Sequence, residues 1–437
     1  STSPCRRTRT TTCTVSVVPA APAPRAPRSA SPARTMPSPC RRSKNCWAAR
    51  SPARCRRPNC SSRYRASTER RRGEKRRSHP ASPFSFLRHA GAAAGHRGGS
   101  ALARQYLKVQ NGQIVYIHSG DRMSAATPLI VQQAEAEQLL ARIDVLQAMR
   151  QLFLDLAAGQ ALQPAQQLVE FPAGRGDFIN YLGVLAQEQV YGVKTSPYIV
   201  REQGPLVTAW TLLMSMQTGQ PLLLCDAARL TTARTAATTA VAVDALAPAE
   251  AGRLALIGSG PVAHAHLQYV KGLRDWQGVR VHSPCLDERR LQSLRAIDPR
   301  AEAAGSLEEA LDEADVILLC TSSARAVIDP RQLKRPALVT SISTNAPRAH
   351  EVPAESLAAM DVYCDYRHTT PGSAGEMLIA AEQHGWSPEA IRGDLAELLS
   401  GQAPRPEYRR PAFFRSIGLG LEDVALANAL YRLRQAG

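Results

Sequence analysis

A glycine-rich turn between a strand and a helix is the feature that most constrains this chain. Residues 254–257 are apolar and run into a G-x-G-x-x-A pattern that begins at Gly258. The first glycine permits a tight turn, the second lets the backbone approach a pyrophosphate, and the small Ala263 allows the helix to pack closely on the strand. The helix N-terminus then holds the phosphate. The predicted cofactor-binding residues of this turn are Gly258, Ser259, Gly260, Pro261 and Val262.

The segment after Arg253 alternates between strand and helix patterns. Its strands are continuous apolar runs, such as "ADVILLCTS" and "ALVTSIST", and these are typical of a parallel sheet covered on both faces. We therefore predict an α/β fold with a Rossmann-type, doubly wound parallel sheet.

A second, α+β domain is predicted before the glycine-rich turn. Residues 133–159 carry apolar residues at three- and four-residue spacings and predict one amphipathic helix. Alternating stretches between 167 and 226 predict strands of one sheet, including a hairpin at Thr218-Gly219, and a helix is predicted from about 230 to 248. The domains expected are a substrate-binding and dimerisation domain at 123–248, a Rossmann domain at 249–412, and a C-terminal helix at 413–437 that returns to the first domain.

The first 122 residues differ from the rest in charge. They hold 26 Lys and Arg against 3 Asp and Glu, whereas residues 123–437 hold 28 against 34, so the net charge of +17 comes from the leader. Residues 1–100 are rich in Arg, Ser, Pro and Ala and predict disorder. The leader could be a basic tail that binds nucleic acid, a transit peptide, a tail without function, or non-native sequence upstream of a start at Met123, and we favour one of the last two.

Cysteines and hydropathy indicate the surroundings of residues 123–437. Their four cysteines are far apart in sequence and occur in apolar or strand-like contexts, which favours reduced thiols in a cytoplasmic protein. There is no run of 18 apolar residues, so we expect no membrane span. We expect no nucleic-acid partner for this body. His264 and His266 point to different faces of their helix, and we expect no metal site.

The end of the second Rossmann strand bears on cofactor choice. Selection of NAD usually needs an Asp or Glu there to accept hydrogen bonds from the ribose hydroxyls, but this chain has His282-Ser283-Pro284. Ser283, with Arg289 or Arg290 nearby, could instead meet a 2′-phosphate. The sequence favours NADPH and leaves NADH possible.

A longer set of motifs resembles one family. These are Gly192-Val193-Lys194, Thr218-Gly219, Asp226, the string "LTTARTAA" at 230–237 and, about twenty residues later, Ile257-Gly258-Ser259-Gly260. Together they resemble the ornithine cyclodeaminase/μ-crystallin family over nearly all of residues 127–437. The resemblance implies a homodimer in which the substrate domain supplies the dimer sheet. Known members include ornithine cyclodeaminases, alanine and arginine dehydrogenases, ketimine reductases and a hormone-binding crystallin.

The resemblance also assigns site residues. Lys194 and Arg234 match the basic pair that binds the substrate carboxylate, and a guanidinium with a second cation suits that anion. Both lie in apolar or Ala/Thr-rich surroundings, where a charge without an anionic partner is unusual. The further cofactor contacts that we expect are Thr235, Thr321, Ser322, Ser343, Ser416 and Gly418.

Two positions depart from the cyclodeaminase pattern. Asn345 stands where that branch has an aspartate that acts on the substrate amine, and an amide cannot accept a proton. Gln167 lies where related enzymes often have a carboxylate-binding arginine. We count Asn345 among the expected catalytic residues, with Lys194 and Arg234, and Gln167 among the substrate-binding residues.

The string "SISTNAPRAHEVP" resembles the ketimine reductase branch most. The leading expectation is therefore NAD(P)H-dependent reduction of a small cyclic imino acid, Δ1-pyrroline-2-carboxylate to L-proline or its six-membered analogue to L-pipecolate. The alternatives are an ornithine cyclodeaminase, a related amino-acid dehydrogenase, and a non-catalytic binder of NADPH and a small acidic ligand.

Overall fold

The computed structural model describes residues 106–110, 113–117, 127–204, 206–343 and 348–436. Within the predicted leader it describes one two-stranded antiparallel sheet, β1 (Tyr106–Gln110) with β2 (Gln113–Ile117). The rest of the leader lies outside the described residues. The expected disorder of residues 1–100 stays a prediction, as does the expected start at Met123.

The first large sheet has eight strands. Its main path runs β3-β10-β9-β7-β6-β4, with β5 paired to β6 and β8 paired to β7. All pairs are antiparallel except β3 with β10. The bounds are β3 (Leu129–Val131), β4 (Ala161–Leu162), β5 (Gln167–Glu170), β6 (Gly176–Leu185), β7 (Val190–Ile199), β8 (Leu206–Val207), β9 (Trp210–Ser215) and β10 (Pro221–Asp226). The predicted hairpin is confirmed, because β9 and β10 pair across Thr218-Gly219.

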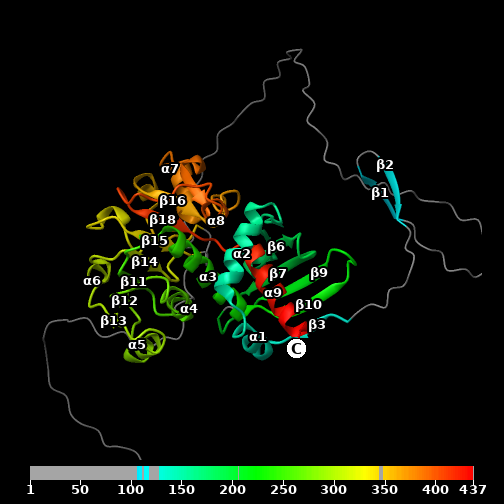
Figure 1. The fold of residues 1–437 in the computed structure, drawn as a ribbon, viewed down its shortest axis with the longest axis horizontal. Coiled ribbons are helices and arrows are strands. Elements are labelled where there is room, and N and C mark those ends of the chain that lie inside the picture. The colour runs from blue at the N-terminus through cyan, green and yellow to red at the C-terminus, as the bar shows by residue number, and fades with distance from the viewer. Residues whose placement is uncertain (1–105, 111–112, 118–126, 205, 344–347, 437) are drawn as a thin grey trace, which may run out of the picture. The chain divides into compact units, whose positions relative to one another are not determined.

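Helices cover one face of this sheet. They are α1 (Gln133–Leu140), α2 (Val145–Ala157), α3 (Ala228–Leu246) and the C-terminal α9 (Gly420–Gln435). The helix α9 lies along β6 and β7, as Figure 1 shows, and the other three helices pack against it. The last helix of the chain therefore packs on the first sheet.

The prediction of a single helix over 133–159 is wrong. The structure breaks it into α1 and α2, because Asp144 caps a new helix by accepting a hydrogen bond from the Gln147 backbone nitrogen at 3.0 Å. The apolar spacing continues through the break, so periodicity alone does not reveal it.

The second large sheet is parallel throughout, in the order β13-β12-β11-β14-β15-β18-β16-β17. Its strands are β11 (Arg253–Ile257), β12 (Gly278–His282), β13 (Ala301–Ala303), β14 (Val316–Leu319), β15 (Leu338–Ser341), β16 (Asp361–Cys364), β17 (Ile391–Asp394) and β18 (Ala412–Arg415). Its helices are α4 (Pro261–Val270), α5 (Glu288–Arg295), α6 (Leu307–Leu311), α7 (Gly375–Gln383) and α8 (Leu395–Leu399). The predicted Rossmann-type fold is confirmed. The insertion of β18 between β15 and β16 was not predicted.

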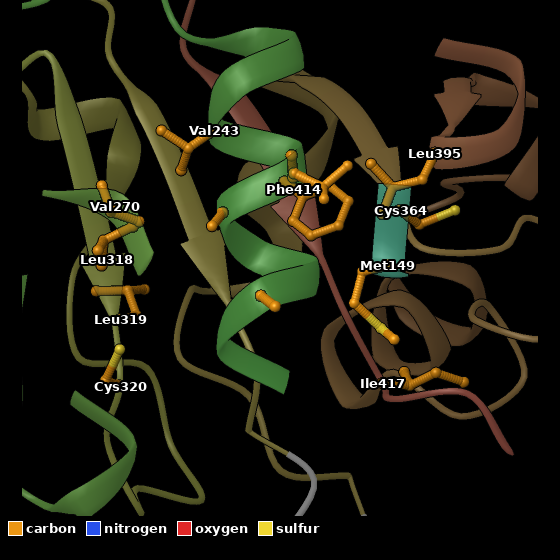
Figure 2. Close-up of a cluster of buried hydrophobic side chains, with 14 of the residues drawn as sticks. Met149, Val243, Val270, Leu318, Leu319, Cys320, Cys364, Leu395, Phe414 and Ile417 are labelled. Atoms are coloured by element: carbon orange, nitrogen blue, oxygen red, sulfur yellow. The ribbon is translucent and has the colours of Figure 1, made fainter. Parts of the chain in front are cut away.

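One apolar core joins the helical layer of the first sheet to the second sheet. Met149 of α2 and Val243 of α3 belong to the same buried cluster as Leu318 of β14 and Phe414 of β18. Figure 2 shows Met149 near Leu395 of α8, which agrees with the packing of α2 on α8.

The division of the chain at 248/249 and 412/413 stays a proposal. Within the described residues, no helix combines the length and the apolar character needed to cross a membrane.

Glycines allow α9 to approach the first sheet closely. A Cβ built on Gly183 of β6 would lie 2.8 Å from Leu421 Cα, and one on Gly192 of β7 would lie 2.7 Å from a methyl group of Val424. Backbone cannot withdraw as a flexible side chain can, so the contact at Gly183 is the more restrictive of the two.

Gly183→Ala is expected to lower the free energy of unfolding by about 1–3 kcal/mol, because the new methyl group overlaps the backbone of α9. Urea unfolding followed by circular dichroism measures this. The matched control is Gly278→Ala in β12, where nothing lies within 4 Å of the added methyl group. Equal stability of the two variants would contradict the close approach of α9.

Candidate functional site

Two cations predicted to act together do lie together in the structure. Lys194 of β7 and Arg234 of α3 are 2% and 4% exposed. Asp423 of α9 connects them: its Oδ2 lies 2.9 Å from Lys194 Nζ, and its Oδ1 accepts a hydrogen bond from Arg234 Nε at 3.0 Å. Glu422 Oε2 accepts a second hydrogen bond from Arg234, from Nη1, at 3.0 Å. We call Lys194, Arg234, Glu422 and Asp423 the charge cluster.

Sequence reasoning missed the two acidic members. Lys194 and Arg234 are unusual because the sequence shows no anionic partner for them. The structure supplies those partners from α9, about 190 residues beyond Arg234 and further beyond Lys194. The signal was present in "GLGLEDVALAN", where two adjacent acids stand in the first turn of a largely apolar helix. Nothing in the sequence alone shows which cations they meet.

The side chains around the charge cluster are polar and aromatic. Lys194 Nζ lies 4.1 Å from the centroid of the Tyr181 ring, which faces it across the β6–β7 pair. It also donates a hydrogen bond to Thr231 Oγ1 at 3.5 Å. Lys194 is therefore held on three sides, by a carboxylate, a hydroxyl and an aromatic face.

Burial shifts the acidities in the cluster. Burial lowers the pKa of Lys194 to about 8, although Asp423 opposes the shift. Burial also raises the pKa of Glu422 to about 8, although Arg234 opposes that shift. Burial acts to lower the pKa of Arg234, but the carboxylates of Asp423 and Glu422 outweigh it, and the pKa is raised. Burial thus brings the pKa values of Lys194 and Glu422 close to neutral pH. Such shifts are common for groups at functional sites that transfer protons or bind ions.

A buried carboxylate joins the charge cluster to the second sheet. Asp365, directly after β16, accepts hydrogen bonds through Oδ2 from Ser416 Oγ and from the backbone nitrogens of Ile417 and Gly418, at 2.7–3.0 Å. Gly418 has φ of +77°, and a Cβ on it would lie 2.2 Å from Arg234 Nη1. The loop that leads from β18 into α9 is thus fixed against the Arg234 guanidinium.

Ser416 and Gly418 were predicted to contact the cofactor. Both lie in this loop, and Gly418 lies against Arg234. Their cofactor role stays a prediction.

The glycine-rich turn has the geometry that a dinucleotide needs. Gly258 has φ of +128°, and a Cβ on it would lie 2.4 Å from the Cys320 carbonyl oxygen, so the chain requires glycine there. Above Gly260 nothing lies within 4 Å of such a Cβ. Gly260 is the N-cap of α4 and provides no side-chain cap, Pro261 follows at N1, and the first turn is therefore open to an anion. These residues fit the pyrophosphate of a dinucleotide.

Most of the predicted contacts around that turn lie at the carboxyl ends of strands, whereas Thr235 lies within α3. The hydroxyls of Ser259 and Ser283 lie 3.1 Å apart. Ser343 Oγ donates a hydrogen bond to the Ser323 carbonyl oxygen, which brings the loops after β14 and β15 together. Ser322 lies in the first of these loops. Thr235 Oγ1 donates back to the Thr231 carbonyl oxygen within α3.

Glu351 organises the same edge of the sheet and was not predicted. Its Oε1 accepts hydrogen bonds from the backbone nitrogen and the hydroxyl of Thr321, at 2.9 and 2.7 Å. Its Oε2 accepts from Ser341 Oγ and the Ile342 nitrogen, at 2.8 and 3.1 Å. One buried side chain therefore ties the end of β14 to the end of β15. Burial raises the pKa of Glu351, although its hydrogen-bond donors oppose the rise.

Asn345 lies outside the described residues. The segment before it is anchored by Arg415 of β18, which donates a hydrogen bond to the Ser343 carbonyl oxygen and pairs with Glu376 at 2.7 Å, with both side chains fully buried. Gln167 is exposed on β5, and in the described part of the chain its side chain bonds to neither Lys194 nor Arg234. The proposed roles of both residues stay predictions.

Two histidines have structural contacts. His266 is fully buried, with Nδ1 2.8 Å from the Val262 carbonyl oxygen and Nε2 3.1 Å from Thr239 Oγ1, and it joins α4 to α3. His350 Nδ1 lies 2.8 Å from the Arg348 carbonyl oxygen. Among the residues that the structure describes, no three His, Cys, Asp or Glu side chains are grouped to hold a metal ion.

Residues 126–436 are similar to a known protein family and to several of its characterised members. Residues 126–436 match the profile of a family described as "Ornithine cyclodeaminase/mu-crystallin family". The NAD(P)H-dependent anabolic L-arginine dehydrogenase DauB of Pseudomonas aeruginosa is 99% identical over 315 residues, which are 72% of this chain and 100% of that protein. A Δ1-pyrroline-2-carboxylate reductase of Bacillus cereus is 23% identical over 312 residues, 69% of this chain and 95% of that protein.

Solved structures show the same fold. The Thermococcus litoralis Δ1-pyrroline-2-carboxylate reductase in complex with NADH and L-proline matches with a TM-score of 0.65 at 22% identity, over 70% of this chain and 98% of that chain. Its architecture agrees with the two large sheets described above.

Alanine substitutions at the two glycines of the turn should have different effects, one on folding stability and the other on cofactor binding. Gly258→Ala is expected to lower the free energy of unfolding by about 1–3 kcal/mol, because its methyl group meets the Cys320 carbonyl. Gly260→Ala should leave that free energy within about 0.5 kcal/mol and raise the KM for the nicotinamide cofactor about tenfold, because the methyl group enters the open space over the turn. Urea unfolding and steady-state kinetics measure the two effects. A Gly260→Ala variant with the parent's KM would contradict a pyrophosphate at this turn.

Proposed function

This chain belongs to the ornithine cyclodeaminase/mu-crystallin family, and we propose that it is an NAD(P)H-dependent oxidoreductase that forms L-arginine from the corresponding 2-oxo acid and ammonia. The observation that carries the proposal is the 99% identity over the full length of an NAD(P)H-dependent anabolic L-arginine dehydrogenase. Arginine formation therefore replaces reduction of a cyclic imino acid as the leading hypothesis.

The chemistry links the two substrate classes. A 2-oxo acid and ammonia lose water to give an imine whose carbon bears a carboxylate, and a cyclic imino acid presents the same C=N–carboxylate unit. Hydride addition at that carbon, with one proton to nitrogen, gives the amino acid, and bound NAD(P)H supplies the hydride. A site built for the carboxylate and the imine carbon serves either class, and the side-chain pocket then selects between them.

The charge cluster supports this proposal. Lys194 and Arg234 would orient the substrate through its carboxylate, so that positioning and electrostatics supply much of the rate. Asn345 would orient the imine or a water molecule. Because the imine is already electrophilic once protonated, reduction needs no strong base at the position where the cyclodeaminase branch has aspartate.

Reduction of Δ1-pyrroline-2-carboxylate is the second candidate. The string "SISTNAPRAHEVP" and the resemblance to the ketimine reductase branch support it, whereas ornithine cyclodeamination is disfavoured by Asn345. We also propose that NADPH is preferred over NADH, because Ser283 occupies the place of the acid that selects NAD.

The first measurement is NADPH oxidation at saturating ammonium with 5-guanidino-2-oxopentanoate, beside Δ1-pyrroline-2-carboxylate, and ammonia release from L-ornithine with NAD⁺. Rapid oxidation with the guanidino acid is expected. Faster turnover of the cyclic imine would overturn arginine formation in favour of the second candidate, and formation of both ammonia and proline from ornithine would favour the cyclodeaminase.

Arg234→Lys should lower kcat/KM for the preferred substrate about 10- to 100-fold, mainly through KM. The lysine keeps the positive charge but loses the guanidinium fork, which corresponds to a loss of about 1.4–2.7 kcal/mol. Steady-state kinetics give the value. The control is Arg229→Lys on the same helix, because Arg229 is exposed and pairs with Glu137 at the surface. A loss below about threefold at Arg234 would remove it from substrate binding.

We further propose that the chain forms a homodimer through the uncovered face of the first sheet. The described helices lie on its other face, and the uncovered face carries partly exposed apolar residues along neighbouring strands. These are Leu182, Val184, Tyr191, Val193, Leu212, Met214 and Leu224.

Val193→Arg is expected to convert the dimer to a monomer, because a charge on this face would be buried without a partner at the interface. Size-exclusion chromatography with light scattering gives the mass. Ser293→Arg, which adds the same charge on the exposed surface of α5, should leave the dimer intact. A monomeric parent, or a dimeric Val193→Arg variant, would contradict the interface.

A further inference from the structure

The two carboxylates of the charge cluster have unequal partners. Asp423 directs one oxygen to Lys194 and the other to Arg234. Glu422 directs Oε2 to Arg234 Nη1, whereas its Oε1 is buried and has no hydrogen-bond partner among the described residues. The Glu422 side chain is fully buried. The unpartnered oxygen therefore cannot be compensated by bulk water.

An ionised carboxylate in this position is costly. A buried charge needs hydrogen bonds to all its lone pairs, and a neutral carboxylic acid loses less on burial. Two further carboxylates face Glu422: Asp423 in its own helix, and Asp365 after β16, whose Oδ2 accepts three hydrogen bonds. The cations that favour the ionised form of Glu422 are Arg234 of α3, in direct contact, and Lys194 of β7. Tyr181 of β6 lines the same cluster.

We propose that Glu422 is held as the neutral carboxylic acid, so that Lys194, Arg234 and Asp423 together keep one net positive charge, which the carboxylate of the substrate neutralises. The substrate class named here is a small carboxylate next to a C=O or C=N carbon. This inference rests on the proposed function in that the substrate carries such a carboxylate. It does not depend on which side chain the substrate has.

The proposal makes Glu422 a positioning residue that sets the charge of the site without touching the substrate. If Glu422 were ionised, the four groups would sum to zero, and a bound carboxylate would leave a buried net negative charge. Burial raises the pKa of Glu422 to about 8, and burial lowers the pKa of Lys194 to about 8. Above that pH the free site loses up to two protons, and both must return when a carboxylate binds.

The test measures binding of inert carboxylates to the NADP⁺-loaded enzyme by isothermal titration calorimetry. The probes are 5-guanidinopentanoate, which has the arginine chain without its amine, and pyrrole-2-carboxylate, a planar analogue of a cyclic imino acid. Glu422→Gln fixes the side chain in a neutral state that can still accept the Arg234 hydrogen bond. Its Kd should equal the parent's at about pH 6.5 and be about tenfold lower than the parent's at about pH 9, because a group with a pKa near 8 is then about nine-tenths ionised.

The ratio of the parent's Kd to that of Glu422→Gln, taken at each pH, reports the ionisation of Glu422 alone, since deprotonation of Lys194 occurs in both proteins. A ratio that stays constant from about pH 6.5 to about pH 9 would overturn the proposal. Glu376→Gln, which changes another buried, arginine-paired glutamate, serves as control, and its ratio to the parent should not vary with pH.

A second measurement needs no variant. In the parent, log Kd should rise with pH above about pH 9 with a slope approaching about two, one proton each for Lys194 and Glu422. A slope of about one would mean that Glu422 does not titrate with binding, and would overturn the proposal.

The two probes separate this inference from the proposed function. If pyrrole-2-carboxylate alone binds and shows the expected pH dependence, the charge assignment stands and arginine formation fails. If 5-guanidinopentanoate binds without that dependence, the proposed function stands and the role of Glu422 fails. If neither carboxylate binds, both are wrong.

Discussion

The contacts between the acidic residues of α9 and the two buried cations hold the first sheet, α3 and α9 together. Lys194 comes from a strand, Arg234 from the long helix α3, and the two carboxylates from the last helix of the chain. All four side chains are buried and have each other as their main polar partners, so removal of Asp423 would leave two buried cations without their shared anion. The glycines of β6 and β7 bring α9 close enough for this arrangement.

Buried carboxylates then connect the cluster to the parallel sheet. Asp365 holds the loop that ends against Arg234, and Glu351 joins the strand ends beside the dinucleotide turn. Arg415 and Glu376, both fully buried, fix the segment that leads to Asn345. Buried acids thus fix the loops beside the charge cluster and beside the glycine-rich turn, and Asp365 and Glu351 do so at the carboxyl ends of the parallel strands, where open α/β sheets bind their ligands.

The parts of this design that depend on local chemistry could be predicted from the sequence. The turn at Gly258 requires particular backbone angles and close contacts, and these leave a local pattern. Lys194 and Arg234 were assigned through the resemblance to the family, and the rarity of charges in apolar strands and helices agreed with that assignment. Their partners could not be predicted, since Glu422 and Asp423 lie about 190 residues beyond Arg234 and further beyond Lys194, and meet them only through tertiary folding. The break between α1 and α2 was missed because Asp144 caps a helix without interrupting the apolar spacing. The insertion of β18 was missed because strand order is not a local property.

The position of β18 has a consequence for synthesis on the ribosome. This strand lies between β15 and β16, which precede it in sequence, and α9 follows it directly. Until residues 412–435 have left the exit tunnel, β15 and β16 have no strand between them and Lys194 and Arg234 have no carboxylate partners. Such long-range pairing is slow and leaves strand edges exposed during translation. The central strand pairing of the parallel sheet and the charge cluster can therefore form only after β18 and α9 have been synthesised.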